Sequence, residues 1–482
     1  MMDVAQKAVR EALQAGADQA DARVGRISKE DLVLRNGALA EASAPDDFGL
    51  GVRVIKDGCW GFAAAPGNAK DLMDVAPGLA RRAVKAARDL AATRVKPVSQ
   101  APETGQVAEW MTPVEEDPFA VSLADKIELL HSVDAQLQGC DETVAREVGV
   151  SLRREEQWQA SGEGAALHQI LLRTGAGLSS TARANGTVQR RSYPASFGGN
   201  YQSGGWEVVR KMDLVANARR IRDEARALCF ADRCPAGERT LILGGSQLCL
   251  QIHESVGHPT ELDRVFGHEV DLAGSSFAMP DLLGSRYGAE RVNLIADSTV
   301  PGGLDTRGFD DDGVASQRWP IVNEGIFSGY LTSREWAHKV GDERSRGCSR
   351  AESWYDPPIV RITNLSLMPG SGSLDELLAS TEDGAIFADT VRSWSIDQRR
   401  LNFQFTSEIA YEVQGGKLGR MLRQPTYQGS TPDFWRSCDA ICGPEAWELW
   451  GVPNCGKGNP MQVAEMSHGA APARFRDVTF VN

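Results

Sequence analysis

Residues 239–259 read RTLILGGSQLCLQIHESVGHP, in which a short apolar run is followed by two glycines and a helical pattern. The run at residues 239–243 predicts a buried strand. Apolar side chains then recur at every fourth position, which predicts an amphipathic helix that begins near Ser246 and ends at Pro259. Ser246 is the expected cap, because a serine hydroxyl accepts hydrogen bonds from the first free amides of a helix. This stretch therefore predicts a strand that leads directly into a helix.

Two of the seven histidines of the chain flank a glutamate in this helix, as His253, Glu254 and His258. On a regular helix, residues five apart point roughly 140° away from each other, so the two imidazoles would face different directions. A π-bulge or a break near Gly257 would give them a common face. In that arrangement the histidines supply two nitrogen ligands to a metal, and Glu254 can act as a general base toward water. The alternative is two histidines bound by backbone groups at a helix end.

A catalytic zinc site requires a third protein ligand. The candidates are Glu261, Asp263, His268, Cys249 and Cys455. Cys249 lies on the same helix and favours buried packing, and the position of His268 does not match the metzincin spacing. Cys455 stands in the sequence Asn-Cys-Gly-Lys-Gly, where a nearby lysine favours a thiolate. The residues alone leave the third ligand open, and Cys455 has the surroundings that best suit one.

Two further patterns carry weaker signals. Cys438 and Cys442 have a spacing found in metal sites, but no second pair accompanies them, so packing is the better interpretation. Asp310, Asp311 and Asp312 precede Gly313 and would suit a cation, yet acidic turns that end in glycine are common without one.

Length and charge limit the classes of function. A chain of 482 residues is too long for one core and predicts two or three domains. Its formal net charge of −13 opposes binding to a phosphate backbone, so no nucleic-acid partner is expected. No stretch approaches the roughly 18 apolar residues of a membrane span. Nine scattered cysteines, without an export signal, indicate reduced thiols rather than a disulfide framework. We expect a cytoplasmic protein with no membrane partner.

Local patterns predict a multidomain α+β fold, with a two-part N-terminal region and a larger strand-rich C-terminal domain that carries the metal-site helix. A proline-rich run at residues 94–118 predicts a linker, and a second break follows residue 232. The predicted domains are therefore residues 1–105, 106–232 and 233–482.

Turn and cap signals locate individual elements. Asn36-Gly37, Asp57-Gly58, residues 322–326 and Gly415-Gly416 predict hairpin turns. Helices are expected from Asp3 as cap to Ala15, over residues 79–92, after Ser122, and over residues 213–228. Residues 142–182 predict successive strands, and the glycine-rich residues 197–205 a loop or a sheet edge.

The chain resembles the TldD branch of the TldD/PmbA family of metallopeptidases, once described as modulators of DNA gyrase. The resemblance rests on the segment 253–258 followed by Glu261 and Asp263, on residues 311–313 and 323–330, and on residues 454–457. It covers nearly the full length. Pro259 and Thr260 stand where the TldD pattern has glycine and leucine, and His468 lies in a tail that departs from the usual glycine- and valine-rich sequence.

The resemblance implies a Zn²⁺ site of His253, His258 and Cys455 with Glu254 as the catalytic acid and base. Glu261, Asp263 and Gly257 would be supporting or substrate-side residues.

The resemblance also implies that unfolded or short peptides enter a cavity and bind as an added strand. The partner would be a PmbA/TldE-like subunit in a heterodimer, or a second copy in a homodimer. We therefore expect a zinc metallopeptidase. The alternative is a non-catalytic peptide-binding or regulatory subunit with a structural zinc, for which a closed site of four protein ligands would be typical.

Overall fold

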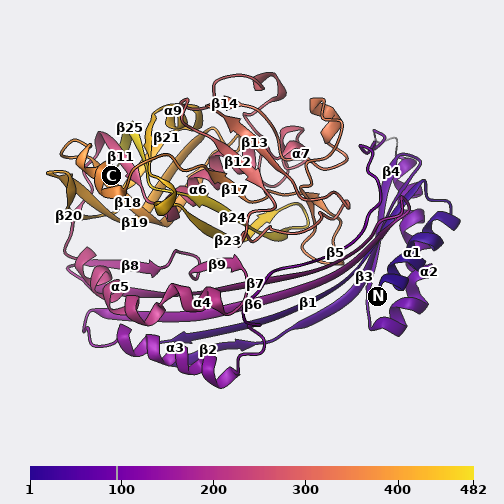
Figure 1. Cartoon of the computed structure of the whole chain (residues 1–482), viewed down its shortest axis with the longest axis horizontal. Coiled ribbons are helices and arrows are strands. Elements are labelled where there is room, and N and C mark those ends of the chain that lie inside the picture. The colour runs from indigo at the N-terminus through magenta and orange to yellow at the C-terminus, as the bar shows by residue number, and fades with distance from the viewer. Residues whose placement is uncertain (94–95, 482) are drawn as a thin grey trace.

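A long sheet lies at the centre of the computed structural model, which describes residues 1–93 and 96–481. A strand-rich C-terminal domain covers one face of this sheet, and helices cover the other face (Figure 1). The chain is a multidomain α+β protein, as predicted. Among the described residues, no helix is both long enough and apolar enough to cross a membrane.

The central sheet has the strand order β4-β3-β1-β6-β7-β5, with β2 beside β1 and both β8 and β9 beside β7. Its strands are β1 (Gln19–Arg35), β2 (Ala38–Ser43), β3 (Asp46–Lys56), β4 (Cys59–Pro66), β5 (Val107–Met111), β6 (Thr143–Ser161), β7 (Ala166–Ala184), β8 (Thr187–Tyr193) and β9 (Asn200–Ser203). Asn36 and Gly37 have φ of 52° and 81°, and Asp57 and Gly58 have 53° and 73°. Two positive φ values in a row make the tight turns of these hairpins, so both predictions are confirmed.

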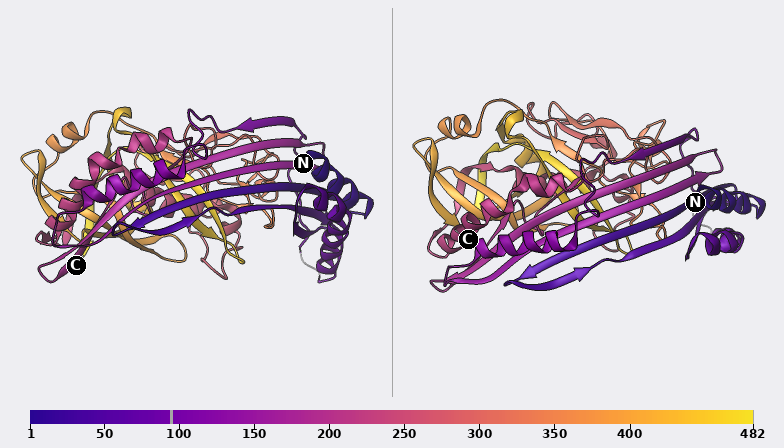
Figure 2. Two further views of the ribbon diagram at one scale, coloured as in Figure 1. Left: turned by 90° about the horizontal axis from the view of Figure 1, so that it is seen from below. Right: turned by 60° about the horizontal axis from the view of Figure 1, so that its bottom comes forward.

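Two groups of helices cover opposite ends of the long strands (Figure 2). The helices are α1 (Met2–Gln14), α2 (Ala69–Ala91), α3 (Leu123–Leu137), α4 (Glu207–Met212) and α5 (Leu214–Leu228). Val24 of β1 packs under α1 and α2, whereas Leu34 of the same strand packs under α3, α4 and α5. Side chains alternate between the faces of a strand, so Arg23 and Gly25 face the C-terminal domain. Arg23 forms an ion pair with Asp311 there.

The two predicted N-terminal segments share this sheet. β1 of the first segment pairs with β6 of the second along 15 residue pairs, from Asp21 with Ser161 to Arg35 with Glu147. The helices of each segment nevertheless form a separate apolar cluster. The domain boundary at residues 105/106 stays a prediction.

Three local predictions were wrong. Asp3 is not a cap, because α1 begins at Met2 and its first turn has no side-chain cap. The second helix begins ten residues before Leu79, since Asn68 caps it and Pro77 is accommodated inside. The expected linker contains β5, which is ordered by parallel pairing with β7. Its residues 94–95 lie outside the described part. The cap Ser122, the helix of residues 213–228 and the strands of residues 142–182 are confirmed.

The C-terminal domain is built on a second sheet that closes on itself, because β21 pairs with both β25 and β19. Its strands are β10 (Asp232–Arg233), β11 (Gly237–Leu243), β18 (Ile386–Ile396), β19 (Asn402–Gln414), β20 (Lys417–Arg423), β21 (Thr426–Ser430), β22 (Cys438–Ile441) and β25 (Ala473–Val481). β11 contains the predicted strand at residues 239–243. The hairpin turn at Gly415-Gly416 is confirmed between β19 and β20.

Smaller elements surround this closed sheet. The strands are β12 (Leu294–Asp297), β13 (Arg318–Asn323), β14 (Ile326–Phe327), β15 (Ser349–Arg350), β16 (Ile359–Val360), β17 (Leu365–Leu367), β23 (Glu448–Lys457) and β24 (Gln462–Ala470). The helices are α6 (Gly245–Ile252), α7 (Leu262–Val265), α8 (Leu374–Ala379) and α9 (Thr431–Arg436), with 3₁₀ turns at Pro280–Leu282, Ala337–Val340 and Pro444–Ala446. β13 and β14 form the predicted hairpin at residues 322–326. β23 and β24 form a hairpin of their own, which packs against α6.

Candidate metal centre

The helix after β11 widens where the two histidines lie. α6 is regular, but His253–Gly257 form one π-helical turn, followed by the 3₁₀ turn His258–Thr260. The amide of His258 donates to the carbonyl of His253, five residues earlier. The extra residue in this turn places the two rings 4.7 Å apart between centroids. The wider turn that the spacing calls for is therefore present.

Two details of this helix differ from expectation. Its cap is Gly244, and Ser246 instead donates its hydroxyl to Asp389 Oδ1 at 2.7 Å. Gly257 has a φ of −59°, which any residue adopts, so backbone freedom is not the reason for glycine. A Cβ at this position would lie 2.8 Å from Cδ1 of Ile362. Glycine is thus required by space.

Cys455 reaches the two histidines from β23, 197 residues after His258. Its Sγ lies 3.5 Å from Nε2 of His258, and one ligand atom from each of His253, His258 and Cys455 lies within 4.8 Å of the others. All three side chains are buried. The structure thus brings together three residues of two types, histidine and cysteine, that bind zinc.

The other candidate ligands have other partners. Cys249 lies 3.7 Å from the carbonyl of Trp450, and His268 packs edge-on against Trp336 with centroids 4.6 Å apart. Glu261 accepts from Nδ1 of His258 at 2.8 Å, and Asp263 forms an ion pair of 2.6 Å with Lys457. Neither carboxylate belongs to the three-residue cluster.

Hydrogen bonds fix which nitrogen of each histidine carries its proton. His468 belongs to β24, and its two ring nitrogens have different partners. Its Nδ1 lies 2.8 Å from the carbonyl oxygen of Leu365, and its Nε2 lies 2.8 Å from Nδ1 of His253. A carbonyl only accepts, so Nδ1 of His468 donates and its Nε2 accepts from His253. Nδ1 of His258 donates to Glu261. Nε2 of both His253 and His258 is therefore the nitrogen without a proton, whose lone pair a metal can take.

Sequence reasoning gave His468 no role. It lies 215 residues from His253 and belongs to no motif, so no local signal could have identified it. Arg400, described below, was missed for the same reason.

Burial and neighbouring charges favour the protonation states of metal ligands. Burial lowers the pKa of both His253 and His258, which keeps the imidazoles neutral. Burial alone would raise the pKa of the Cys455 thiol, but His258 and Arg361 outweigh it, and that pKa is lowered. Burial also opposes the charge of Glu261, yet Lys457 and His258 hold its pKa well below the ordinary value. Burial thus disfavours the charged imidazoles, while the cations of Arg361 and Lys457 favour the charged forms of Cys455 and Glu261.

Glu254 faces a cavity of about 330 Å³ next to the three clustered side chains. Its Oε2 lies 2.7 Å from Nη1 of Arg400. Phe197 and Trp394, which meet edge to face at 5.4 Å, line the same cavity. The cavity therefore has a carboxylate, a guanidinium and apolar walls beside the cluster.

The residues present fit a zinc ion. The donor set is two neutral imidazoles and one thiolate, and each histidine is oriented by a second hydrogen bond. His258 and Cys455 also line the cavity with Glu254, so a fourth ligand position is accessible from it. Three protein ligands with an accessible position are typical of a catalytic site rather than a structural one.

The acidic run at residues 310–312 does not fit a cation. Asp310 accepts from three backbone amides, those of Asp312, Val314 and Ser349, each at 2.9 Å. Asp311 pairs with Arg23 at 3.0 Å, and Asp312 with Arg53 at 2.8 Å. These carboxylates join the C-terminal domain to the central sheet. Cys438 and Cys442 are buried in the apolar core of the C-terminal domain, as the packing interpretation predicts.

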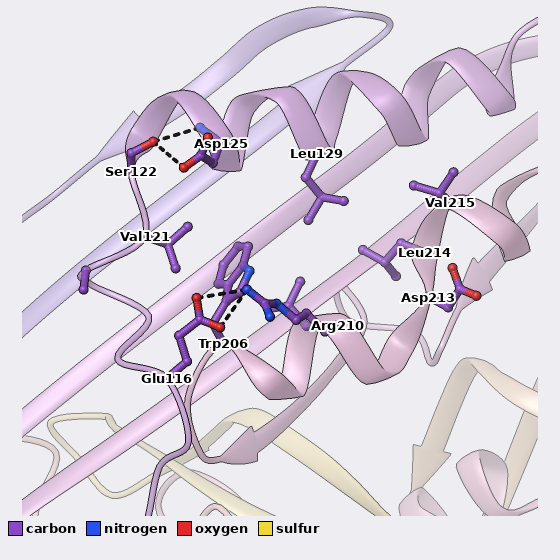
Figure 3. A pocket seen from close by; sticks show the side chains of 12 residues that line it. Glu116, Val121, Ser122, Asp125, Leu129, Trp206, Arg210, Asp213, Leu214 and Val215 are labelled. Atoms are coloured by element: carbon purple, nitrogen blue, oxygen red, sulfur yellow. Dashed lines mark hydrogen bonds and ion pairs between the residues drawn. The ribbon is translucent and has the colours of Figure 1, made fainter.

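A larger cavity, of about 620 Å³, lies on the helical side of the central sheet (Figure 3). Leu129, Trp206 and Leu214 supply apolar surface there, and Glu116 pairs with Arg210 at 2.8 Å. None of the clustered ligands of the metal centre lines it. The volume of this cavity is therefore no evidence of a catalytic role.

The chain is similar in sequence to metallopeptidase domains and to known metalloproteases. The family description "PmbA/TldA metallopeptidase C-terminal domain" matches residues 237–479, and "PmbA/TldA metallopeptidase domain 1" matches residues 20–91. A metalloprotease of Methanocaldococcus jannaschii is 28% identical over 91% of this chain and 92% of that protein. The zinc metalloprotease TldD homolog of Saccharolobus solfataricus is 27% identical over 41% of this chain and 42% of that protein. The structure of TldE from Thermococcus kodakarensis has a TM-score of 0.77 at 15% identity, covering 99% of this chain and all of that one, which shows a shared fold alone.

Proposed function

This chain belongs to the PmbA/TldD family of metallopeptidases, and from that premise we propose that it is a zinc-dependent endopeptidase that hydrolyses unfolded or short peptides. The observation that carries the proposal is the cluster of His253, His258 and Cys455 beside a cavity that Glu254 also lines. The zinc metalloprotease name of the Saccharolobus solfataricus relative supports zinc as the metal.

The proposed chemistry assigns a proton-transfer role to Glu254. A zinc ion held by His253, His258 and Cys455 would supply a Lewis acid that polarises the scissile carbonyl and acidifies water. Glu254 takes a proton from the attacking water as its oxygen bonds to the carbonyl carbon. When the carbon–nitrogen bond breaks, Glu254 returns that proton to the leaving amine. His468 and Glu261 hold the two imidazoles in the tautomer that presents Nε2.

The substrate proposal follows from the size and lining of the cavity. A space of about 330 Å³ holds a few residues of an extended peptide and excludes a folded domain. Phe197 and Trp394 offer apolar contact to a substrate side chain.

The assembly that we propose is a dimer in the cytoplasm, with either a PmbA/TldE-like subunit or a second copy of this chain. The ground for this proposal is the resemblance to the TldD branch of the family. Nine free cysteines support a reducing compartment.

Glu254→Gln tests the proposed chemistry, because it keeps the shape of the side chain and removes the base. We expect unchanged zinc content and a loss of peptide cleavage of about 10²–10⁴-fold. Cleavage of an unfolded peptide is measured with and without a PmbA/TldE-like partner, alongside zinc per chain. Glu343→Gln, which changes an exposed glutamate outside the cavity, is the matched control. Equal cleavage by Glu254→Gln and wild type would exclude Glu254 as the base. An inactive wild type in every pairing would favour the non-catalytic alternative.

A further inference from the structure

Arg400 is a cation in the lining of the cavity beside the metal centre. It lies in the turn between β18 and β19, and its Nη1 is 2.7 Å from Oε2 of Glu254. Of the described residues that line this cavity, it is the one lysine or arginine. A single positive charge is therefore placed next to the group proposed to handle the proton.

The donors of this guanidinium are only partly used. Nη2 lies 3.5 Å from the carbonyl of Ala273, a long contact, and Nε is buried without a hydrogen-bond partner among the described residues. An arginine offers five N–H donors, and a buried donor without an acceptor is unfavourable. The ion pair with Glu254 thus leaves capacity for another acceptor.

The turn holds Arg400 in a conformation that is unusual for its residue type. Arg400 has a φ of 61°, in the left-handed region that favours glycine. Asp397 fixes the turn by accepting from the amides of Arg399 and Leu401, and the carbonyl of Arg400 accepts from Thr431. Surroundings that maintain a strained backbone at one residue are typical of functional sites.

We propose that Arg400 contacts the substrate and donates a hydrogen bond to the carbonyl oxygen of the scissile peptide as that oxygen becomes negative. This inference rests on the proposed peptidase function. Water adds to the carbonyl carbon, and the π electron pair of the carbonyl moves onto its oxygen. Arg400 stabilises that charge without transferring a proton. The carbonyl then reforms as the carbon–nitrogen bond breaks, and Glu254 gives its proton to the amine.

A negatively charged oxygen could also come from the C-terminal carboxylate of a peptide. Both sources present the same chemistry to a guanidinium. Peptides with a free carboxyl end and the same peptides with an amidated end separate the two. If removing the guanidinium weakens binding of the free-acid peptides only, Arg400 binds the C-terminal carboxylate of the peptide. That result would overturn the proposal.

Arg400→Gln and Arg400→Lys test the role, with Arg399→Gln, an exposed arginine of the same turn, as the matched control. For Arg400→Gln we expect kcat to fall about 10²–10³-fold with KM changed only a few-fold. Zinc content stays at the wild-type value. Arg400→Lys recovers part of the rate because it keeps a positive charge, and Arg399→Gln matches wild type. An equal loss in Arg399→Gln, or loss of zinc in Arg400→Lys, would overturn the proposal.

Binding of a phosphinic peptide, which resembles the tetrahedral oxyanion, provides a readout that does not need turnover. Its affinity is compared between Glu254→Gln and the double variant Glu254→Gln/Arg400→Gln. A residue that acts only by orienting Glu254 would have no further effect once Glu254 is neutral. We expect the double variant to bind at least tenfold more weakly, and equal affinities would overturn the proposal. This binding experiment remains decisive if wild type cleaves no peptide, so failure of the proposed function is distinguished from failure of this inference.

Discussion

Two buried clusters of metal-ligating residue types lie in the C-terminal domain, and they differ in what their donor atoms contact. In the cluster of His253, His258 and Cys455, the ligand atoms lie close together and both imidazole Nε2 atoms are unprotonated. Within the described part of the chain, Nε2 of His258 has a hydrogen-bond contact only with Sγ of Cys455, another member of the cluster. In the cluster of Asp310, Asp311 and Asp312, the carboxylate oxygens already accept from amides, an amide side chain and arginines.

The contrast shows that residue type and burial do not make a metal site. Buried carboxylates satisfied by permanent donors act as links in the fold, because a cation would have to displace hydrogen bonds that are already made. The two histidines of the other cluster also make hydrogen bonds to His468 and Glu261, but they make them through Nδ1. Nε2 of each ring is left to bind a metal. What decides between the two clusters is whether the ligand atoms have lone pairs that permanent hydrogen-bond donors do not already occupy.

Asp311→Ala should give the largest effect on stability. The change leaves Arg23 buried without its counter-charge and removes the acceptor for Gln157 and the amide of Ala351. Removing one partner of a buried ion pair costs about 3–5 kcal/mol, measured as the free energy of unfolding in urea. Zinc content stays unchanged. Asp74→Ala, at an exposed position of α2, is expected to stay within about 0.5 kcal/mol of wild type. A loss of zinc in Asp311→Ala would contradict the contrast between the clusters.

Cys455→Ser tests the cluster that is proposed to bind zinc. Zinc sites with a full set of protein ligands bind with about 10–16 kcal/mol, so one ligand accounts for on the order of 3 kcal/mol, or at least 100-fold in affinity. Zinc affinity is measured by competition with a chelator. Cys249→Ser, which changes a cysteine that lines the same cavity but lies outside the cluster, serves as control. An unchanged zinc affinity in Cys455→Ser would exclude Cys455 as a ligand.

Acid should weaken the links between the C-terminal domain and the sheet through Glu465. Its carboxylate pairs with Arg153 at 3.0 Å, and although burial opposes its charge, arginines hold its pKa at about 2. A folded-state pKa below the ordinary value contributes stability above about pH 4.5, and this stability is lost as the pH falls toward 2. Between pH 6 and pH 3 the loss is about 2 kcal/mol, measured by urea unfolding at both values. Glu465→Gln should lack this part of the pH dependence, and an identical profile would refute the assignment.

His468→Val should have the smallest effect, because it changes a support and leaves all three proposed ligands in place. Without the acceptor for Nδ1 of His253, the ring and its tautomer are less fixed, and zinc affinity should fall about tenfold. In His468→Gln an amide oxygen remains to accept the bond, so its affinity should lie nearer wild type. Equal affinities in all three proteins would show that the orientation of His253 does not depend on this contact.

The sequence predicted those parts of the fold that depend on neighbouring residues. Asn36-Gly37 predicted a hairpin because its residue types adopt positive φ, and Ser122 predicted a helix start because its hydroxyl reaches the next free amides. β5 was missed inside a proline-rich run, since pairing with β7, from about 60 residues later, orders it.

The candidate site divides in the same way. The spacing of His253 and His258 alone indicates that a shared face needs a widened turn, because helix geometry is local, and the structure has that turn. His468 and Arg400 reach the site from 215 and 146 residues away, and no pattern within either segment indicates the contact. Supporting groups of this kind depend on tertiary structure, which spacing alone does not contain.

The position of Cys455 also sets the time at which the centre can be completed during translation. The 197 residues between His258 and Cys455 take roughly 10 to 40 s to synthesise at about 5–20 residues per second. Throughout that interval the nascent chain exposes two of its three proposed ligands, and the β23–β24 hairpin that supplies the third has not left the ribosome. Hydrolytic competence would therefore arise only after the β23–β24 hairpin has been made, because a copy not yet extended to Cys455 lacks the proposed third ligand.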